Sequence, residues 1–172
     1  MIKRPGAIQF SGKPASIVGV DLTVGQTASA FRCLRQDWSV YRPLTLLKKQ
    51  VKIIAAVPSL DTAVCDRETR RFNEEAANLS ELISILVISA DLPFAQKRWC
   101  GAAGIDRLEV VSDHRWLDFG KKYACLIWEP GILRRAIFVL DANNQIRYAA
   151  YMPKLGDEPD YAAVLAAARS LL

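Results

Sequence analysis

The sequence predicts an α/β protein whose central sheet is partly parallel and partly antiparallel. Three strand patterns are separated by two helical patterns, and a hairpin pattern and one last helix follow. Strand–helix–strand units form parallel sheets with helices on the faces, whereas a hairpin adds antiparallel strands. No polar linker interrupts the chain, so we expect a single domain over residues 1–172.

The first predicted elements are a short hairpin and a buried strand. Residues 7–10 and 15–18 flank a polar turn that contains Gly12, which favours a peripheral hairpin. Residues 51–57 are apolar except for Lys52 and rich in β-branched side chains, as expected for a strand that is buried on both faces. Pro58 ends this strand.

The middle of the chain continues the strand–helix alternation. A helix begins at about Val64, with a buried stripe formed by Phe72, Ala76 and Leu79. Residues 83–89 form the next strand. A second helix then starts with Asp91 as N-cap and Pro93 in its first turn. A shorter strand at 108–111 and a helix at about 116–123 follow.

The last third predicts a hairpin and a terminal helix. Residues 136–140 and 146–151 flank the turn-forming residues 141–144. The final helix begins at Asp160 and presents an apolar stripe made of Tyr161, Val164, Leu165, Ala168 and Leu172.

Composition narrows the class of protein. At 172 residues and 51% hydrophobic content the chain can bury a core without disulfide support. The four cysteines are far apart and contain no Cys-x-x-Cys pair, which argues against a zinc ribbon and against a thioredoxin-type active site; they are Cys33, Cys65, Cys100 and Cys125. His114 is the single histidine, so we expect no metal site.

Charge and hydropathy indicate the compartment and exclude some partners. The net charge is +5, but basic residues are mixed with acidic ones along the chain, so we expect no nucleic-acid partner. The N-terminus shows no signal-peptide pattern and no window resembles a membrane span. We therefore expect a cytoplasmic protein with no membrane contact.

Cys65 is the most informative residue because it lies where a buried strand gives way to a helix. A thiol in the first helical turn faces unpaired backbone N–H groups and the positive end of the helix dipole, and both favour the nucleophilic thiolate. Thr62, three residues earlier, places a hydroxyl beside the sulfur. Each residue also has an ordinary interpretation: Thr62 as N-cap, Pro58 as strand terminator, and Cys65 as a small buried hydrophobe.

Cys100 is a candidate partner for an oxidised Cys65. It lies on a helix that ends in small residues, so local unfolding can release it. A sulfenic acid condenses with a thiol that comes near enough to form a disulfide. The alternative is that Cys100 is a buried helical cysteine, and packing is also the favoured interpretation for Cys33 and Cys125.

Two segments resemble one enzyme family. Residues 58–65, PSLDTAVC, resemble the P-x-x-x-[TS]-x-x-C signature of peroxiredoxins. Residues 89–100, SADLPFAQKRWC, are similar to a segment typical of bacterial thiol peroxidases, which are atypical two-cysteine peroxiredoxins. The N-terminal hairpin, the LRRAIFVLD string at 133–141 and EPDY at 158–161 extend the resemblance over nearly the whole chain. Residues 28–31 and 123–125 depart from the family pattern.

The resemblance implies a thioredoxin-like fold with a mixed central sheet, flanking helices and an N-terminal β-hairpin. It implies a homodimer that reduces hydrogen peroxide and alkyl hydroperoxides without a cofactor. It assigns the peroxidatic role to Cys65, the resolving role to Cys100, and active-site support to Pro58, Thr62 and Arg135. The disulfide is then reduced by thioredoxin.

Two other functions remain open at this point. The same cysteine pair would also serve a peroxide-sensing redox switch, although no effector domain is recognisable. A thiol-disulfide oxidoreductase would share the fold, but that class needs its two cysteines close in sequence. Here the two cysteines are 35 positions apart, the difference between 100 and 65.

Overall fold

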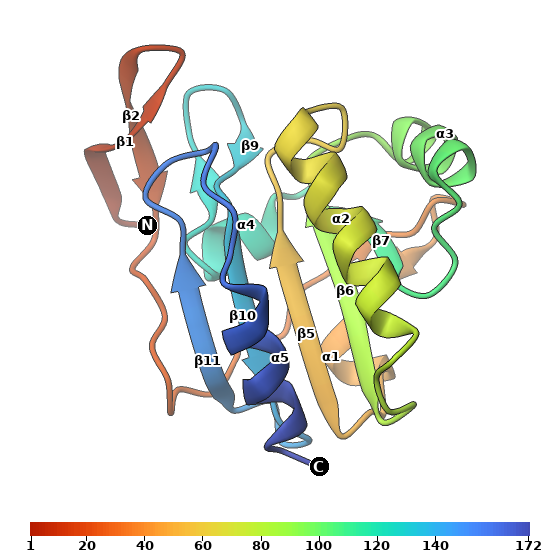
Figure 1. Ribbon diagram of the computed structural model, residues 1–172. Coiled ribbons are helices and arrows are strands. Elements are labelled where there is room, and N and C mark those ends of the chain that lie inside the picture. The colour runs from red at the N-terminus through yellow and green to blue at the C-terminus, as the bar shows by residue number, and fades with distance from the viewer.

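The computed structural model describes residues 1–172 as two β-sheets with helices packed on both faces of the larger one (Figure 1). The larger sheet has seven strands in the order β11-β10-β5-β6-β7-β3-β4. In chain order these are β3 (Cys33–Leu34), β4 (Val40–Tyr41), β5 (Val51–Ala56), β6 (Ile83–Ser89), β7 (Glu109–Ser112), β10 (Ala136–Leu140) and β11 (Ile146–Tyr151). Strands β5, β6 and β7 are parallel and the others pair antiparallel, so the predicted mixed α/β sheet is confirmed.

Strand β5 is an interior strand of this sheet, next to the central strand β6. It pairs in parallel with β6, from Val51 opposite Ile83 to Ala56 opposite Ile88, and antiparallel with β10 on its other side. All six of its residues are buried, as predicted for a strand covered on both faces. Its carboxyl end therefore lies between the carboxyl end of β6 and the amino end of β10, away from both outer strands, at the edge where open α/β sheets carry their functional loops.

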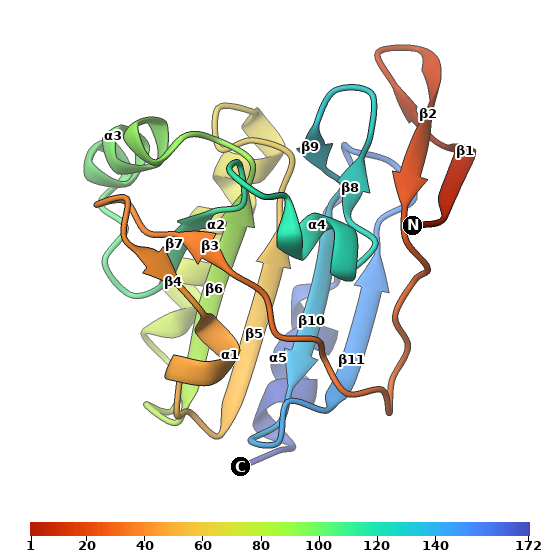
Figure 2. The same ribbon diagram turned by 180° about the vertical axis from the view of Figure 1, so that it is seen from behind.

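Helices cover the two faces of the large sheet. In Figure 1, α2 (Ala63–Ala76) and α5 (Tyr161–Arg169) lie on the near face. In the reverse view, α1 (Pro43–Leu46) and α4 (Asp118–Lys122) lie on the opposite face (Figure 2). A separate apolar cluster lies between each face and its helices. The cluster under α2 and α5 includes Phe72 and Val164, and the cluster on the α4 side includes Phe119 and Phe138. Helix α3 (Pro93–Ala103) connects β6 to β7 beside the start of α2.

A second, four-stranded sheet carries the N-terminal hairpin. Its order is β1-β2-β8-β9, with β1 (Lys3–Phe10), β2 (Lys13–Val18), β8 (Leu126–Ile127) and β9 (Ile132–Leu133). Gly19 follows the hairpin with φ +97, and a Cβ there would lie 2.8 Å from the Lys121 carbonyl oxygen. Only glycine allows the backbone to approach this closely, so the chain after β2 packs directly against the C-terminal end of α4.

The structure confirms most predicted elements and corrects several. The strands at 83–89, 136–140 and 146–151 have the predicted bounds, and Asp160 caps α5 by accepting from the Ala163 N–H at 3.0 Å. The helix predicted at 116–123 is shorter because Leu117 adopts a left-handed conformation just before it. Leu172 does not extend the α5 stripe, since it lies beyond the helix and is exposed. The elements β3, β4, α1, β8 and β9 were not predicted, because periodicity cannot be seen in two to four residues.

Asp91 is not the N-cap of α3. Leu92 occupies that position and makes no side-chain capping bond. The Asp91 carboxylate instead accepts from the loop after β5, where it holds Ser59 and Leu60. None of the helices is both long and apolar enough to cross a lipid bilayer.

Candidate active site around Cys65

The loop that leaves β5 positions the candidate nucleophile. Val57 continues the pairing with β6 through its N–H, which donates to the Ile88 carbonyl at 2.9 Å, and Pro58 is buried immediately after it. The chain then turns through Ser59, and α2 begins with Thr62 as N-cap. Cys65 is the third residue of α2, so its sulfur lies in the first turn, as the sequence predicted.

The Cys65 sulfur is completely buried and has two polar neighbours. The Thr62 Oγ1 lies 2.8 Å from Sγ, and the Arg135 Nη2 donates to Sγ at 3.3 Å. The Thr62 hydroxyl does not cap the helix, and it also lies 2.9 Å from the Ser59 carbonyl. Because a hydroxyl both donates and accepts, Thr62 can donate to a thiolate, or accept from a thiol while donating to Ser59.

Arg135 is held rigidly beside the sulfur. It immediately precedes β10 and is almost fully buried. Its Nη1 forms an ion pair with Glu68 Oε2, and its Nη2 also donates to the Leu155 carbonyl at 3.0 Å. A guanidinium carries several donors in a fixed plane, so one side chain serves the carboxylate, the carbonyl and the sulfur together.

Arg134, its neighbour in sequence, points to a different partner. It donates to the Ala124 carbonyl at 2.8 Å and forms an ion pair with Asp21. The structure thus brings Arg135 to the cysteine and leaves Arg134 to connect the segment before β10 to the chain that follows β2.

Glu68 is a site residue that the sequence reasoning missed. It lies three residues after Cys65 and four before Phe72, so all three share the buried face of α2. Burial raises the pKa of Glu68 to about 7, against the opposing charge of Arg135. Its spacing on the helical stripe was the available signal, since a charged residue at a core position is rarely incidental.

Asp91 is the second residue that the sequence reasoning did not place in the site. One carboxylate oxygen accepts from Ser59 Oγ at 2.7 Å, and the other accepts from the Leu60 N–H at 2.9 Å and from Ser89 Oγ at 2.8 Å. This carboxylate therefore fixes the loop that carries Pro58 and Thr62 to the end of β6.

Cys100 has a separate environment. It is buried on α3, where Gln36 Nε2 lies 3.4 Å from its sulfur. Burial raises the pKa of the Cys100 thiol, with the Gln36 hydrogen bond opposing. Cys65 and Cys100 are both free thiols and share no hydrogen-bonding partner. The structure places both in the apolar cluster beneath α2 and α5.

Cys33 and Cys125 lie on the opposite side of the sheet. Both are fully buried in the cluster around Phe119 and Phe138, and burial raises the pKa of each thiol. The central sheet thus separates them from Cys65 and Cys100. This location agrees with the packing role that the sequence favoured for both.

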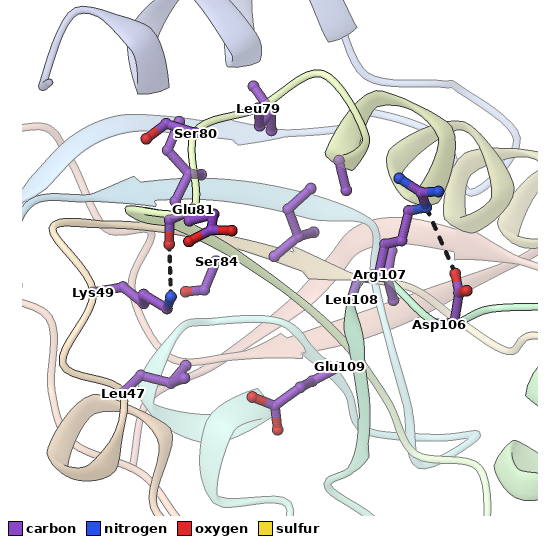
Figure 3. A pocket seen from close by; sticks show the side chains of 13 residues that line it. Leu47, Lys49, Leu79, Ser80, Glu81, Ser84, Asp106, Arg107, Leu108 and Glu109 are labelled. Atoms are coloured by element: carbon purple, nitrogen blue, oxygen red, sulfur yellow. Dashed lines mark hydrogen bonds and ion pairs between the residues drawn. The ribbon is translucent and has the colours of Figure 1, made fainter.

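One surface hollow lies beside the candidate site, and a second cavity lies away from it. A hollow of about 490 Å³ lies beside the candidate site and is lined by Leu60, Asp61, Thr62, Ala63, Asp66, Arg67 and Trp99. The cavity of about 400 Å³ in Figure 3 is elsewhere, between the C-terminal end of α2 and the amino end of β6, where Lys49 Nζ donates to the Glu81 carbonyl at 2.6 Å. No candidate site residue lines that cavity.

Comparison with known proteins finds a matching family model and similar curated proteins. Residues 23–165 match the family model described as Redoxin. The chain is 49% identical over 158 residues to a thiol peroxidase of Oceanobacillus iheyensis, covering 92% of this chain and 95% of that one. It is 45% identical over 165 residues to a thiol peroxidase of Bacillus subtilis, covering 96% and 98% of the two chains.

A solved structure has the same fold as this chain. The peroxiredoxin-like protein of Aquifex aeolicus superposes with a TM-score of 0.87 at 37% identity, over 97% of this chain and 98% of that one. This likeness confirms the thioredoxin-like fold that the sequence resemblance implied.

Proposed function

Because the chain belongs to the redoxin family and is a thiol peroxidase of the peroxiredoxin class, we propose that Cys65 is the peroxidatic cysteine and Cys100 the resolving one. The observation that carries this assignment is the pair of contacts at Cys65 Sγ, from Thr62 Oγ1 at 2.8 Å and Arg135 Nη2 at 3.3 Å. The two contacts place a hydroxyl and a fixed cation beside a sulfur in the first turn of α2.

In the first step the Cys65 thiolate attacks one oxygen of a hydroperoxide. The S–O bond forms as the O–O bond breaks, which leaves a sulfenic acid on Cys65 and an alkoxide or hydroxide that takes a proton to become an alcohol or water. Arg135 places a fixed positive charge beside the negative sulfur during the attack.

Thr62 and Arg135 also act on the bond that breaks. Negative charge grows on the departing oxygen, and donors that are already oriented toward it lower the barrier without reorganising. The Glu68 ion pair and the Leu155 carbonyl fix the guanidinium in that orientation. Pro58 is buried, shapes the loop after β5 and has no N–H to compete for the sulfur.

In the second step the Cys100 thiol condenses with the sulfenic acid. A disulfide forms between the two sulfurs and water leaves. Both thiols are buried and contact different partners in the folded state, and we infer that parts of α2 and α3 open before this reaction. A thioredoxin-type reductant then restores both thiols. The cycle needs no cofactor.

The substrates are hydrogen peroxide and alkyl hydroperoxides. The hollow beside Thr62 combines the apolar side chains of Leu60 and Ala63 with polar groups, which suits a hydroperoxide that carries an alkyl chain. We further propose that residues 1–172 act as one domain, that the protein is cytoplasmic, and that it functions as a homodimer, as the family resemblance implies.

Two cysteine variants test the assignment. Cys65→Ser should lose peroxide consumption with thioredoxin and its reductase present. Cys100→Ser should still reduce one equivalent of peroxide but form no intramolecular disulfide, as read by intact mass and peptide mapping. Steady turnover by Cys65→Ser, or a disulfide through Cys33 or Cys125 in the wild type, would overturn the scheme.

A further inference from the structure

Helices α2 and α3 are linked by two residues that are sequence neighbours of the candidate cysteines. Asp66 follows Cys65, and Trp99 precedes Cys100. The Trp99 Nε1 donates to Asp66 Oδ1 at 3.0 Å. A bond between α2 and α3 therefore lies directly beside both thiols.

A second link lies one turn further along both helices. Arg70, four residues after Asp66, donates from Nη1 to the carbonyl of Ala103, four residues after Trp99, at 3.3 Å. The Arg70 Nε also donates to Asp66 Oδ2 at 2.9 Å, and its guanidinium lies 5.6 Å from the centre of the Trp99 ring. One oxygen of Asp66 thus accepts from Trp99 on α3, and the other accepts from Arg70 on α2.

Helix α3 has a small buried face. Beyond its contacts with Asp66 and Arg70, Gln96 donates to Ser89 Oγ at 3.0 Å and to the Val111 carbonyl at 2.8 Å. Of its eleven residues only Pro93, Gln96 and Cys100 are buried, and Phe94 is 67% exposed. It ends in Gly101, Ala102, Ala103 and a left-handed Gly104. A helix with so few buried apolar side chains opens at low cost, so polar contacts make up a large share of what keeps it closed.

We propose that Asp66, Arg70 and Trp99 form a clamp that holds α3 against α2 and limits how fast Cys100 reaches oxidised Cys65. This inference rests on the proposed roles of the two cysteines. In disulfide formation the three residues are positioning residues, because they act there through the location of Cys100. Asp66 and Trp99 also line the hollow beside Thr62, and Arg70 does not.

The clamp decides between two fates of the sulfenic acid. While α3 is closed, a second hydroperoxide can oxidise the sulfenic acid to sulfinic acid, with loss of an alcohol or water. When α3 opens, the Cys100 thiol forms the disulfide and releases water. Opening also removes the burial that raises the pKa of Cys100, so the released thiol is more often the reactive thiolate.

Trp99→Phe tests the clamp by removing the indole N–H while keeping an aromatic ring. One net hydrogen bond corresponds to a factor of about five in an equilibrium. We expect disulfide formation about fivefold faster than in the wild type, and a similarly smaller sulfinic fraction at a fixed excess of hydrogen peroxide. Quenched samples analysed by mass spectrometry, with a sulfenic-acid trap, give both values.

Arg70→Gln is the second variant, because its side chain lies outside the hollow beside Thr62. It should react with hydrogen peroxide at the wild-type rate and then form the disulfide several-fold faster. Arg98→Gln is the matched control. It breaks a contact at 3.3 Å between the same helix and Asp61. Those two side chains are 70% and 59% exposed, against 45% and 33% for Arg70 and Asp66, so the control should change disulfide formation much less than Arg70→Gln.

Hydrogen exchange separates this proposal from the proposed function. Amides of α3 should exchange about fivefold faster in Trp99→Phe than in the wild type, whether or not the cysteines react. Unchanged exchange, or disulfide formation no faster than in the Arg98→Gln control, overturns the clamp. Absence of a Cys65–Cys100 disulfide in the oxidised wild type would instead overturn the cysteine roles on which the clamp depends.

Discussion

Replacing Arg135 with methionine removes the guanidinium that donates to Cys65 and leaves Glu68 without a counter-charge. Methionine is similar in length and apolar, so the site stays filled. Two consequences follow from one change, a slower reaction at the sulfur and a less stable fold, and the structure predicts their sizes separately.

The expected loss of rate is about a hundredfold or more, which is typical when one oriented donor to a developing negative charge is removed. The expected loss of stability is about 3–5 kcal/mol, the cost of leaving one member of a buried ion pair alone.

The loss of stability depends on pH with a definite sign. Without Arg135 the folded-state pKa of Glu68 rises above 7. Between the unfolded value and this raised value, the folded state holds a proton that the unfolded state has released, so the free energy of unfolding falls as pH rises. In the wild type Glu68 takes up a proton as pH falls through about 7, so the two proteins differ least at low pH. The difference between variant and wild type therefore grows above pH 7.

Urea denaturation at pH 6 and pH 8.5 gives the stability, and single-turnover reaction with hydrogen peroxide gives the rate. The double variant Arg135→Met/Glu68→Gln should recover most of the stability at pH 8.5 but none of the rate. Arg134→Met is the control, since Arg134 contacts Asp21 and not Cys65. A rate within tenfold of the wild type, or an equal loss in the control, would refute the reasoning.

Three further predictions concern the loop and the other thiols. Thr62→Val removes the hydroxyl 2.8 Å from Cys65 and should slow the reaction with peroxide about a hundredfold, whereas Thr62→Ser should stay near the wild-type rate constant. Asp91→Asn replaces one accepting oxygen in the loop network and should lower the free energy of unfolding by about 1–3 kcal/mol, measured by urea denaturation. One equivalent of peroxide should leave Cys33 and Cys125 reduced, because burial raises the pKa of both thiols. Alkylation of the two thiols after denaturation measures this, and a disulfide at either cysteine would contradict it.

The strongest elements could be predicted because their patterns are long. Strand β5, with its β-branched residues, and β6, β10 and β11 were recognisable from local hydropathy and turn residues. Strands β8 and β9 were not, because each has two residues and exists only through pairing with β2 and with each other. Two residues are too few to show a hydropathy pattern, whatever the residues are.

The misassigned Asp91 illustrates a different limit. Its position before Pro93 is typical of an N-cap, and local sequence favours that reading. In the fold the same carboxylate meets Ser59 and Leu60, which are about thirty residues earlier, and those contacts take both oxygens. A capping motif competes with partners that only the folded sheet brings near.

The sequence by itself determined the mixed α/β sheet, the location of Cys65 at the start of a helix and the family to which the chain belongs. These depend on periodicity and on short motifs, which are local. The tertiary structure alone decided that Arg135 and not Arg134 reaches the sulfur, that Glu68 anchors it, and that Asp66 and Trp99 link the helices of the two thiols. Those contacts join segments 33 to 70 residues apart, and their partners become neighbours only when β5, β6 and β10 pair in register.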